Sequence, residues 1–538
     1  MDSIRVERLR CLADTGYIQL KPITVLLGQN SSGKSTFLRI LPLLKQSVES
    51  RTTGPILWSG RLVDFGNFDD AHQNGSEDNI AFSFNFKLGS RNFAYTRDYS
   101  YLFLSEEARI VNTLDITLTL QVSEHKKKET TRTSRIFFQL EDSKIQLDFG
   151  EDEYLTDFFV NSFNVLSLGN KYVSRKIDRS SLLPTITESE QKKEYDFEKS
   201  SSLSRLIRYR SRFRALFQAL IDKTKETAHH ATKLETIIQM ALSFGLGNSE
   251  NMLKDIQENN FASKHWKSKT KDWTIETKDF KELRDLIIAN AIPFIIEKCD
   301  DTIANFSNNI SYIGPVRATA ERYYRTQDLA VDEVDYQGNN LAMFLRNLTD
   351  SEMRSFSAWT LDNFGFKPSI KSSLGHISVR IRSKDSEKDL NVADTGFGFS
   401  QILPVITQLW LLSSFPKGNL QPTSRRVNRG TITYAIEQPE LHLHPRLQGT
   451  LTDALVKSIK AAKDKNIDLR LMIETHSEVL ANRLGQLIAE GEIYPDEINI
   501  VLFEPSDQPG KVRIRNVQFN SDGYLLNWPL GFFEMELV

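Results

Sequence analysis

An eight-residue segment near the N-terminus constrains this chain more than any other feature. Residues 28–35 read Gly-Gln-Asn-Ser-Ser-Gly-Lys-Ser, which matches the pattern G-x-x-x-x-G-K-[ST] at every fixed position. An apolar, β-branched run precedes it at 23–27, and residues 36–41 follow with helical apolar spacing. This pattern forms a phosphate loop when it lies between a strand and a helix. The sequence therefore predicts a strand–loop–helix unit that binds phosphate.

The residue types in this segment suit phosphate chemistry. Glycines let the backbone curl so that its N–H groups face phosphate oxygens, and a helix start adds a favourable dipole. Lys34 would place a positive charge beside the β- and γ-phosphates, and the Ser35 hydroxyl suits Mg²⁺. A chance glycine turn is the alternative, which the flanking strand and helix disfavour. The predicted nucleotide-binding residues are Gly28, Gln29, Asn30, Ser31, Ser32, Gly33, Lys34, Ser35 and Thr36.

Composition excludes several classes of protein. The chain has 538 residues, 40% of them apolar, and a formal net charge of −2, which argues against a surface that is basic throughout and wraps nucleic acid. Two cysteines, Cys11 and Cys299, exclude a disulfide framework and a cysteine-based metal cluster. Apolar runs fall short of the roughly 20 residues of a membrane helix, and the charged start at 1–5 lacks a signal segment. We expect a cytoplasmic protein without membrane association.

Changes of pattern along the chain predict four parts. Residues 1–75 carry the glycine-rich loop. Period-two alternation at 76–170 predicts an antiparallel β subdomain. Residues 171–310 are polar and read as a helical insertion with short helices and an exposed linker at 186–202. Strands alternate with helices over 311–538, which predicts a parallel sheet. The expected fold class is α/β, a largely parallel phosphate-loop sheet with a β subdomain and an inserted helical subdomain.

Another apolar strand ends in carboxylates. Residues 432–436 lead into Glu-Gln-Pro-Glu at 437–440. A carboxylate at a strand end beside a phosphate loop can hold Mg²⁺, directly or through water, and Glu437 is the candidate. His442 and His444 follow, but without a third ligand nearby a structural role is favoured over a metal site.

Two further segments could meet phosphate. Residues 469–473 read as a strand that leads into Glu-Thr-His-Ser at 474–477, where His476 could reach a γ-phosphate or could be a solvated loop histidine. Residues 394–401 read Asp-Thr-Gly-Phe-Gly-Phe-Ser-Gln before an apolar helix. Gly398 and Ser400 would form an anion-ready turn at the helix start, although an ordinary capped helix looks the same.

These four elements, in this order, resemble the ABC-type ATPase head shared by SMC, Rad50 and OLD-family proteins. The segment at 28–35 resembles Walker A, 396–401 a divergent signature motif, 432–439 Walker B, and His476 the switch histidine. The resemblance implies an ATP shared between the Walker A of one protomer and the signature of another. Lys34, Ser35, Glu437 and His476 would act in cis, and Gly398 and Ser400 in trans.

The chain resembles more closely the stand-alone AAA-family ATPases of bacterial anti-phage systems, above all the Septu-type ATPases (PtuA) and their retron-associated form. The segments that carry this resemblance lie at 436–445, 474–477, 312–317 and 527–533. It implies ATP and Mg²⁺ as cofactors, a homo-oligomer formed through the nucleotide site, and a separately encoded HNH-type nuclease partner. For the retron-associated form it implies a complex with a reverse transcriptase and a non-coding RNA.

One departure from the superfamily pattern concerns hydrolysis. The Walker B aspartate and the catalytic glutamate that follows it are replaced here by Glu437 and Gln438. A glutamine cannot take a proton, although it can orient a water. Either Glu440 or His476 assists the attack, or hydrolysis is slow and ATP serves mainly as a structural lock. We favour slow turnover.

Nucleolytic activity is expected to belong to a partner, because neither the middle segment nor the residues after His476 show an HNH, Toprim-like or paired-carboxylate pattern. The most basic stretch, Arg205–Arg214, interleaves arginines with aromatics as a nucleic-acid surface would. An amphipathic helix with a solvated basic face has the same pattern and is favoured. The predicted function is an ATPase that self-associates and scaffolds or regulates a nuclease in antiviral defence. An actively hydrolysing DNA repair or recombination ATPase of the SMC/Rad50 type is the alternative.

Overall fold

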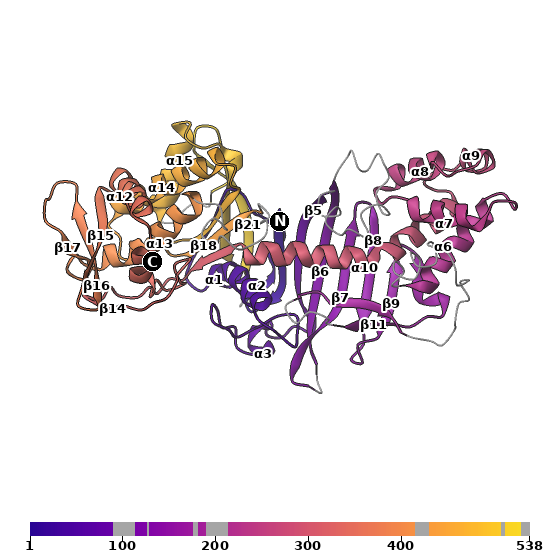
Figure 1. Ribbon diagram of the computed structural model, residues 1–538, viewed down its shortest axis with the longest axis horizontal. Helices are drawn as coiled ribbons and strands as arrows, with labels where there is room; N and C mark the ends of the chain where they lie inside the picture. Colours follow the sequence, from indigo (N-terminus) through magenta and orange to yellow (C-terminus); the bar gives the residue numbers. More distant parts are fainter. Residues whose placement is uncertain are drawn as a thin grey trace. The chain divides into compact units, whose positions relative to one another are not determined.

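The protein divides into two compact units in a computed structural model (Figure 1). The described residues are 1–89, 113–125, 128–175, 181–189, 213–414, 430–506 and 512–528. Each unit is assembled from segments that are far apart in sequence. The first comprises residues 1–7, 47–57 and 75–304, and the second comprises residues 8–46, 58–74 and 305–538. The predicted α/β fold class is confirmed.

An antiparallel sheet forms the first unit's core, in the order β10-β9-β8-β7-β6-β5-β1. Phe82, Phe84 and Phe86 are buried on one face, and the register places Phe84 opposite Leu118 of the next strand. The antiparallel strands predicted from period-two alternation are therefore confirmed. The strand bounds are β1 Ser3–Leu9, β5 Ile80–Gly89, β6 Thr113–His125, β7 Thr130–Leu140, β8 Ser143–Phe149, β9 Leu155–Val160 and β10 Phe163–Asn164.

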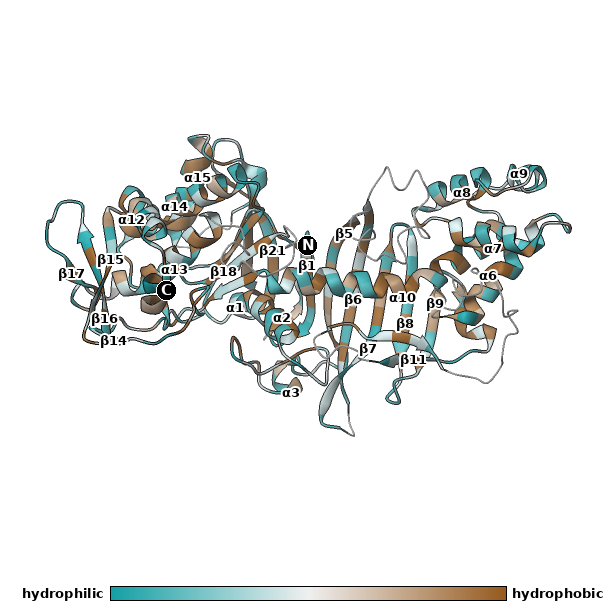
Figure 2. Cartoon of the chain, in the orientation of Figure 1, coloured by the Kyte–Doolittle hydropathy of each residue, from teal (hydrophilic) through white to brown (hydrophobic). Residues whose placement is uncertain are grey.

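Helices follow a short hairpin in the same unit, except that residues 305–308 of the last helix belong to the second unit. Their bounds are α6 Arg214–Thr227, α7 Leu234–Ser243, α8 Ser249–Glu258, α9 Lys264–Thr270 and α10 Lys278–Asn308, and the hairpin comprises β11 Tyr172–Arg175 and β12 Thr185–Glu188. The expectation of short helices is wrong for α10, which runs for 31 residues with Pro293 inside it. Figure 2 shows α8 and α9 as mostly hydrophilic, whereas α10 buries apolar residues such as Leu283, Ile288 and Ile295.

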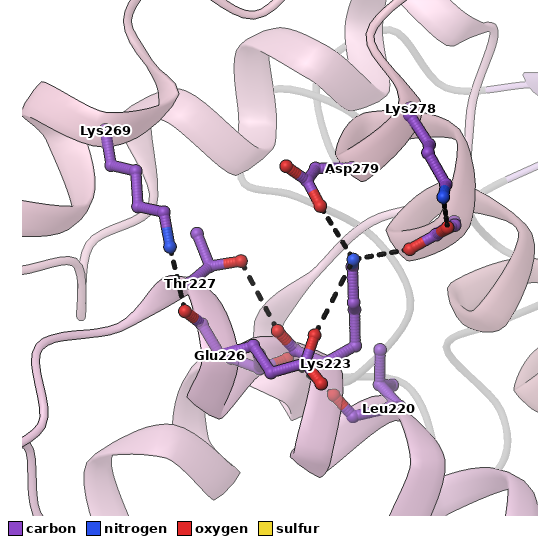
Figure 3. A network of polar contacts seen from close by, with 9 residues as sticks. Leu220, Lys223, Glu226, Thr227, Lys269, Lys278 and Asp279 are labelled. Atoms are coloured by element: carbon purple, nitrogen blue, oxygen red, sulfur yellow. Dashed lines mark hydrogen bonds and ion pairs between the residues drawn. The ribbon is translucent and has the colours of Figure 1, made fainter.

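Ion pairs join the first turn of α10 to α6 (Figure 3). The Lys223 Nζ atom donates to Asp279 Oδ1 at 2.8 Å and also to Glu282, and only 12% of the lysine side chain is exposed. Burial lowers the pKa of Lys223, but the hydrogen bonds and the negative charges of Asp279 and Glu282 together outweigh burial and raise it overall. Lys269 of α9 donates to the main-chain oxygen of Glu226 beside this cluster. The helices are thus joined by charge as well as by apolar packing.

A largely parallel sheet forms the core of the second unit, in the order β13-β18-β19-β4-β20-β21-β22. The first five strands are parallel, and β21 returns antiparallel to β20. The N-terminal strand β4 therefore lies between strands from the far end of the chain. The bounds are β13 Ile310–Ile313, β18 Ile432–Glu437, β19 Leu469–Glu474, β4 Ile23–Gly28, β20 Ile498–Pro505, β21 Val512–Phe519 and β22 Leu525–Leu526.

These strands read as continuous apolar runs because they are buried on both faces, as parallel strands usually are. All six residues of β4 and all six of β18 are buried. Helices of this unit are α1 Lys34–Leu38, α2 Ile40–Glu49, α11 Leu341–Asn347, α12 Asp350–Phe364, α13 Phe397–Ser414, α14 Pro445–Asp464 and α15 Glu478–Ala489. The apolar side chains of α13 and α14 join the strands in one core.

A smaller sheet in the order β14-β16-β15, with β17 beside β16, completes the second unit. Its bounds are β14 Tyr324–Arg325, β15 Phe366–Ser373, β16 His376–Ser383 and β17 Leu390–Asn391. Short elements elsewhere are β2 Leu12–Asp14, β3 Ile18–Gln19, α3 Phe68–Ala71, η1 Val165–Leu168, η2 Val392–Asp394 and η3 Pro495–Glu497. Among the helices of the described ranges, none is long and apolar enough to cross a membrane.

Some sequence predictions fall outside the described residues. Positions 205–212 of the basic stretch do, and α6 begins only at Arg214. The same holds for residues 190–202 of the expected linker and for residues 529–533 of the C-terminal tail.

Candidate nucleotide site

The glycine-rich loop leaves β4 at Gly28 and enters α1 at Lys34. A Cβ atom on Gly28 would lie 2.4 Å from the main-chain oxygen of Phe503, and one on Gly33 would lie 2.7 Å from Leu12 Cδ2. Gly33 also has a φ of 92°, and Ser31 has a φ of 62°. Both fixed glycines are thus required by close approach, and the loop has the curled backbone that a phosphate cradle needs.

The Lys34 side chain lies inside this curl. Its Nζ atom donates to the main-chain oxygens of Gly28 and Gln29 at 3.0 Å and 2.6 Å, and Lys34 is only 3% exposed. Burial lowers the pKa of Lys34, which the charges of Glu474 and Glu440 oppose. The ammonium group is therefore held within the loop by the main-chain oxygens of Gly28 and Gln29.

Ser35 contacts a carboxylate that the sequence reasoning missed. The Ser35 hydroxyl donates to Glu474 Oε1 at 2.6 Å. Glu474 ends β19, is 1% exposed, and its Oε2 atom is buried without a hydrogen-bond partner in the described chain. Burial raises the pKa of Glu474 to about 7; the Ser35 hydrogen bond opposes the rise and the charge of Glu437 adds to it. The signal in the sequence was its position, since it ends the strand before His476 as Glu437 ends β18.

Glu437 lies opposite Glu474 in the register of β18 and β19, but it has different partners. Arg39 binds it with two hydrogen bonds of 2.8 Å, from Nε to Oε1 and from Nη2 to Oε2. The Tyr312 hydroxyl donates to Oε1 at 2.7 Å. The hydrogen bonds to Glu437 raise the pKa of Arg39 despite its burial. Figure 1 shows α1, which precedes Arg39, beside β18.

Gln438, Glu440 and His476 meet where β18 and β19 end. Gln438 has a φ of 43°, and its main-chain N–H donates to the main-chain oxygen of Glu474. Glu440 Oε1 accepts a 2.8 Å hydrogen bond from the main-chain N–H of His476, and burial raises the pKa of Glu440. Burial and the positive charge of Lys34 lower the pKa of His476. The structure thus brings the predicted cis residues together at one edge of the sheet.

The predicted signature segment lies at the start of α13 and connects to β18 through Arg317. Gln401 Nε2 donates to the main-chain oxygen of Arg317 at 3.3 Å, and Arg317 Nη2 donates to the main-chain oxygen of Glu437 at 2.7 Å. Gly398 lies against the main-chain oxygen of His442, and Ser400 is buried. The roles of Gly398 and Ser400 in trans stay a prediction.

His444 has the structural role that the sequence favoured, because its side chain caps the N-terminus of α14. In the described ranges there is no group of three or more His, Cys, Asp or Glu side chains that could hold a metal ion. The groups that fit a nucleotide and its cation are the loop at 28–36 with Lys34, the Ser35 hydroxyl, and the carboxylates that end β18 and β19. Hydroxyl and carboxylate oxygens are the ligands that Mg²⁺ prefers.

The chain is similar to several solved structures and to one protein family. Three solved structures each align with 96% of this chain at low similarity. The SMC head of Pyrococcus furiosus bound to the C-terminal domain of ScpA has 10% sequence identity, 96% of that chain covered and a TM-score of 0.34. An SMC head bound to the C-terminal winged-helix domain of ScpA has 9% identity, 97% covered and a TM-score of 0.32, and the SMC head of Thermotoga maritima has 8% identity, 97% covered and a TM-score of 0.31. No curated protein matches the chain. Residues 1–481 match the family described as the AAA ATPase domain. The chain therefore belongs to the family of AAA ATPase domains.

Proposed function

We propose that this AAA-family ATPase is of the ABC type, that it binds ATP and Mg²⁺, hydrolyses ATP slowly, and self-associates through the nucleotide. The observation that carries slow turnover is the edge formed by Glu437, Gln438 and Glu440. The Gln438 amide occupies the place of the glutamate that would act as general base, Arg39 neutralises Glu437, and one oxygen of Glu440 accepts a hydrogen bond from the His476 N–H. Proton abstraction by a positioned base typically accelerates such reactions 10²–10⁴-fold. Without that base, ATP would be hydrolysed slowly, and bound ATP would chiefly stabilise the assembled state.

The residues of this chain would divide the work as follows. Lys34 and the N–H groups of the loop would neutralise and orient the phosphates, and Ser35 with a strand-end carboxylate would hold the cation. Gln438 would orient the attacking water by hydrogen bonding without accepting its proton. His476, whose pKa burial and the charge of Lys34 lower, would contact the γ-phosphate side of the loop.

Self-association is proposed to place Gly398 and Ser400 of one protomer on the ATP of another. ATP then favours the assembled state because it makes contacts there that it cannot make with a single protomer. The link from α13 through Arg317 to Glu437 supports this arrangement, since it connects the proposed trans surface to the cis site of the same chain.

The biological role that we propose is regulation of a separately encoded nuclease of HNH type in antiviral defence. It rests on the sequence resemblance described above, as does the complex with a reverse transcriptase and a non-coding RNA. Nucleic-acid contact through Arg205–Arg214 stays the less favoured alternative to an amphipathic helix with a solvated basic face. DNA-stimulated hydrolysis would instead favour the repair or recombination role.

The decisive experiment measures both the mass of the assembly in solution and the rate of ATP hydrolysis. We expect multi-angle light scattering to show a larger assembly with ATP than with ADP, and steady-state hydrolysis to be slow and insensitive to DNA. With ATP, the Lys34→Ala variant should keep the smaller mass that the wild type has with ADP. Rapid, DNA-stimulated hydrolysis without an ATP-dependent change of mass would contradict the proposal.

A further inference from the structure

We infer that Glu474, rather than Glu437, is the carboxylate that faces the nucleotide's metal ion beside Ser35, and that Glu437 is a structural anion which fixes Arg39 and Tyr312. The inference rests on the proposed function, because it takes Mg²⁺–ATP to bind at the glycine-rich loop. It assigns different roles to two carboxylates that the sequence pattern makes look equivalent.

The first argument is contact with Ser35. In a phosphate loop, the hydroxyl after the lysine is the group that meets Mg²⁺. Here that hydroxyl donates to Glu474 Oε1 at 2.6 Å. A cation that accepts the Ser35 oxygen as a ligand would therefore lie next to Glu474.

The second argument is the position of each strand. Glu474 is opposite Leu26 of β4, the strand that runs directly into the loop at Gly28. Neighbouring strands lie about 4.8 Å apart. Glu437 ends β18, which is the next strand beyond β19, so its backbone is about 10 Å from β4. The closer strand thus supplies the carboxylate.

The third argument is the number of occupied oxygens. Both carboxylate oxygens of Glu437 accept hydrogen bonds from Arg39, and Oε1 also accepts one from Tyr312. A metal ligand at Glu437 would have to displace a two-point, charge-assisted pair, which is among the strongest polar contacts in proteins.

Glu474 has the complementary property. Its Oε2 atom is buried and has no hydrogen-bond partner in the described residues, although the side chain is only 1% exposed. Leaving such an oxygen unpaired is costly, so the native arrangement indicates a ligand at this position. A hard cation with water in its remaining positions satisfies that oxygen.

The test compares Glu474→Gln with Glu437→Gln in the full-length protein. Affinity for a fluorescent, non-hydrolysable ATP analogue is measured against Mg²⁺ concentration, and Mn²⁺ binding is followed by electron paramagnetic resonance. Removal of a ligand should raise the Mg²⁺ concentration that half-maximal tightening of analogue binding requires by at least about tenfold. For Glu474→Gln we expect that shift together with loss of the signal of protein-bound Mn²⁺. Glu437→Gln should shift the required Mg²⁺ concentration by less than about twofold. Affinity in EDTA should be unchanged for Glu474→Gln.

Controls keep the inference falsifiable. If Glu437→Gln does not fold, Tyr312→Phe perturbs the same carboxylate by removing one hydrogen bond and should leave the Mg²⁺ requirement unchanged. An unshifted Mg²⁺ requirement in Glu474→Gln, or a shift confined to the Glu437 variants, overturns the inference while leaving the proposed ATP binding intact. A wild-type protein that binds no nucleotide at any Mg²⁺ concentration overturns both.

Discussion

Arg317 donates from Nη2 to the main-chain carbonyl oxygen of Glu437 at a distance of 2.7 Å. Arg317 is only 4% exposed, and its Nε and Nη1 atoms have no hydrogen-bond partner in the described chain. Burial lowers the pKa of Arg317, which the charges of Glu440 and Glu437 oppose. The protein thus keeps a poorly solvated cation where the chain turns from Glu437 into Gln438.

Replacing this cation tests whether it serves stability or function. A buried charge with few partners can be exchanged for an apolar side chain at little cost. We expect Arg317→Met to unfold within about 1 kcal/mol of the wild type or above it, yet to weaken ATP-dependent assembly. Thermal melting and light scattering measure the two effects. A strongly destabilised Arg317→Met protein would show that the hydrogen bond to Glu437 has a structural role, and a variant that assembles normally would show that assembly does not depend on it.

Lys34 should matter for nucleotide affinity and little for folding. Hydrogen bonds to charged groups contribute about 1.5–3 kcal/mol, so Lys34→Ala should weaken ATP binding by roughly 10- to 100-fold. Stability should be preserved, because the substitution removes a buried cation. Calorimetric titration gives the affinity. Lys463→Ala, at an exposed position of α14, is the matched control and should bind ATP as the wild type does.

Gln438→Glu should accelerate hydrolysis, because it restores a proton acceptor at the end of β18. We expect kcat to rise by about 100-fold with little change in KM. The backbone conformation at φ 43° is no less accessible to Glu than to Gln, so folding should be unaffected. Gln438→Ala is the control for loss of the side chain. Equal turnover in Gln438→Glu and the wild type would refute the view that the amide limits hydrolysis.

Arg39 and Glu437 form an ion pair, and we expect that replacing one of them alone lowers the free energy of unfolding more than replacing both. Arg39→Met leaves the buried Glu437 carboxylate without its counter-charge, and we expect a loss of roughly 2–3 kcal/mol in the free energy of unfolding. Arg39→Met/Glu437→Gln removes both charges and should recover most of that loss. Urea unfolding of the two single variants and the double variant closes the cycle. Additive effects would mean that the two side chains stabilise the protein independently.

Glu474 should make stability depend on pH in the absence of metal and nucleotide. Its pKa in the folded protein, about 7, exceeds the ordinary value of 4.5. The folded state therefore binds more protons than the unfolded state between these values, and the free energy of unfolding falls as pH rises from about 4.5 to about 7. Glu474→Gln removes this contribution, so we expect the variant to be more stable than the wild type at pH 8, by up to roughly 3 kcal/mol, and similar to it at pH 4.5.

Urea unfolding in EDTA at both pH values measures this difference. Other groups titrate over the same interval, but they do so in both proteins and cancel when the variant is compared with the wild type. A stability difference that is the same at pH 4.5 and pH 8 would contradict the raised pKa.

Local features of this protein could be predicted from its sequence, and contacts between distant residues could not. The glycine loop, the buried strands and the cluster of carboxylates at strand ends follow from patterns a few residues long. The partners Ser35–Glu474 and Arg39–Glu437 depend on strand order, which the patterns leave open. Helix α10 was missed as one long helix because Pro293 removes a backbone donor and normally ends a helical pattern.

The order of strands around β4 has a consequence for biosynthesis. Both neighbours of β4 come from residues 469–505, about 440 residues after Gly28. At about 5–20 residues per second, the ribosome needs roughly 20–90 s to reach them. During that interval the segment at 75–304 is synthesised in full, whereas β4 still lacks both of its neighbouring strands. The sheet around the glycine-rich loop can therefore form only after residue 505 has been synthesised, and a nascent chain that stops before residue 469 lacks both neighbours of β4.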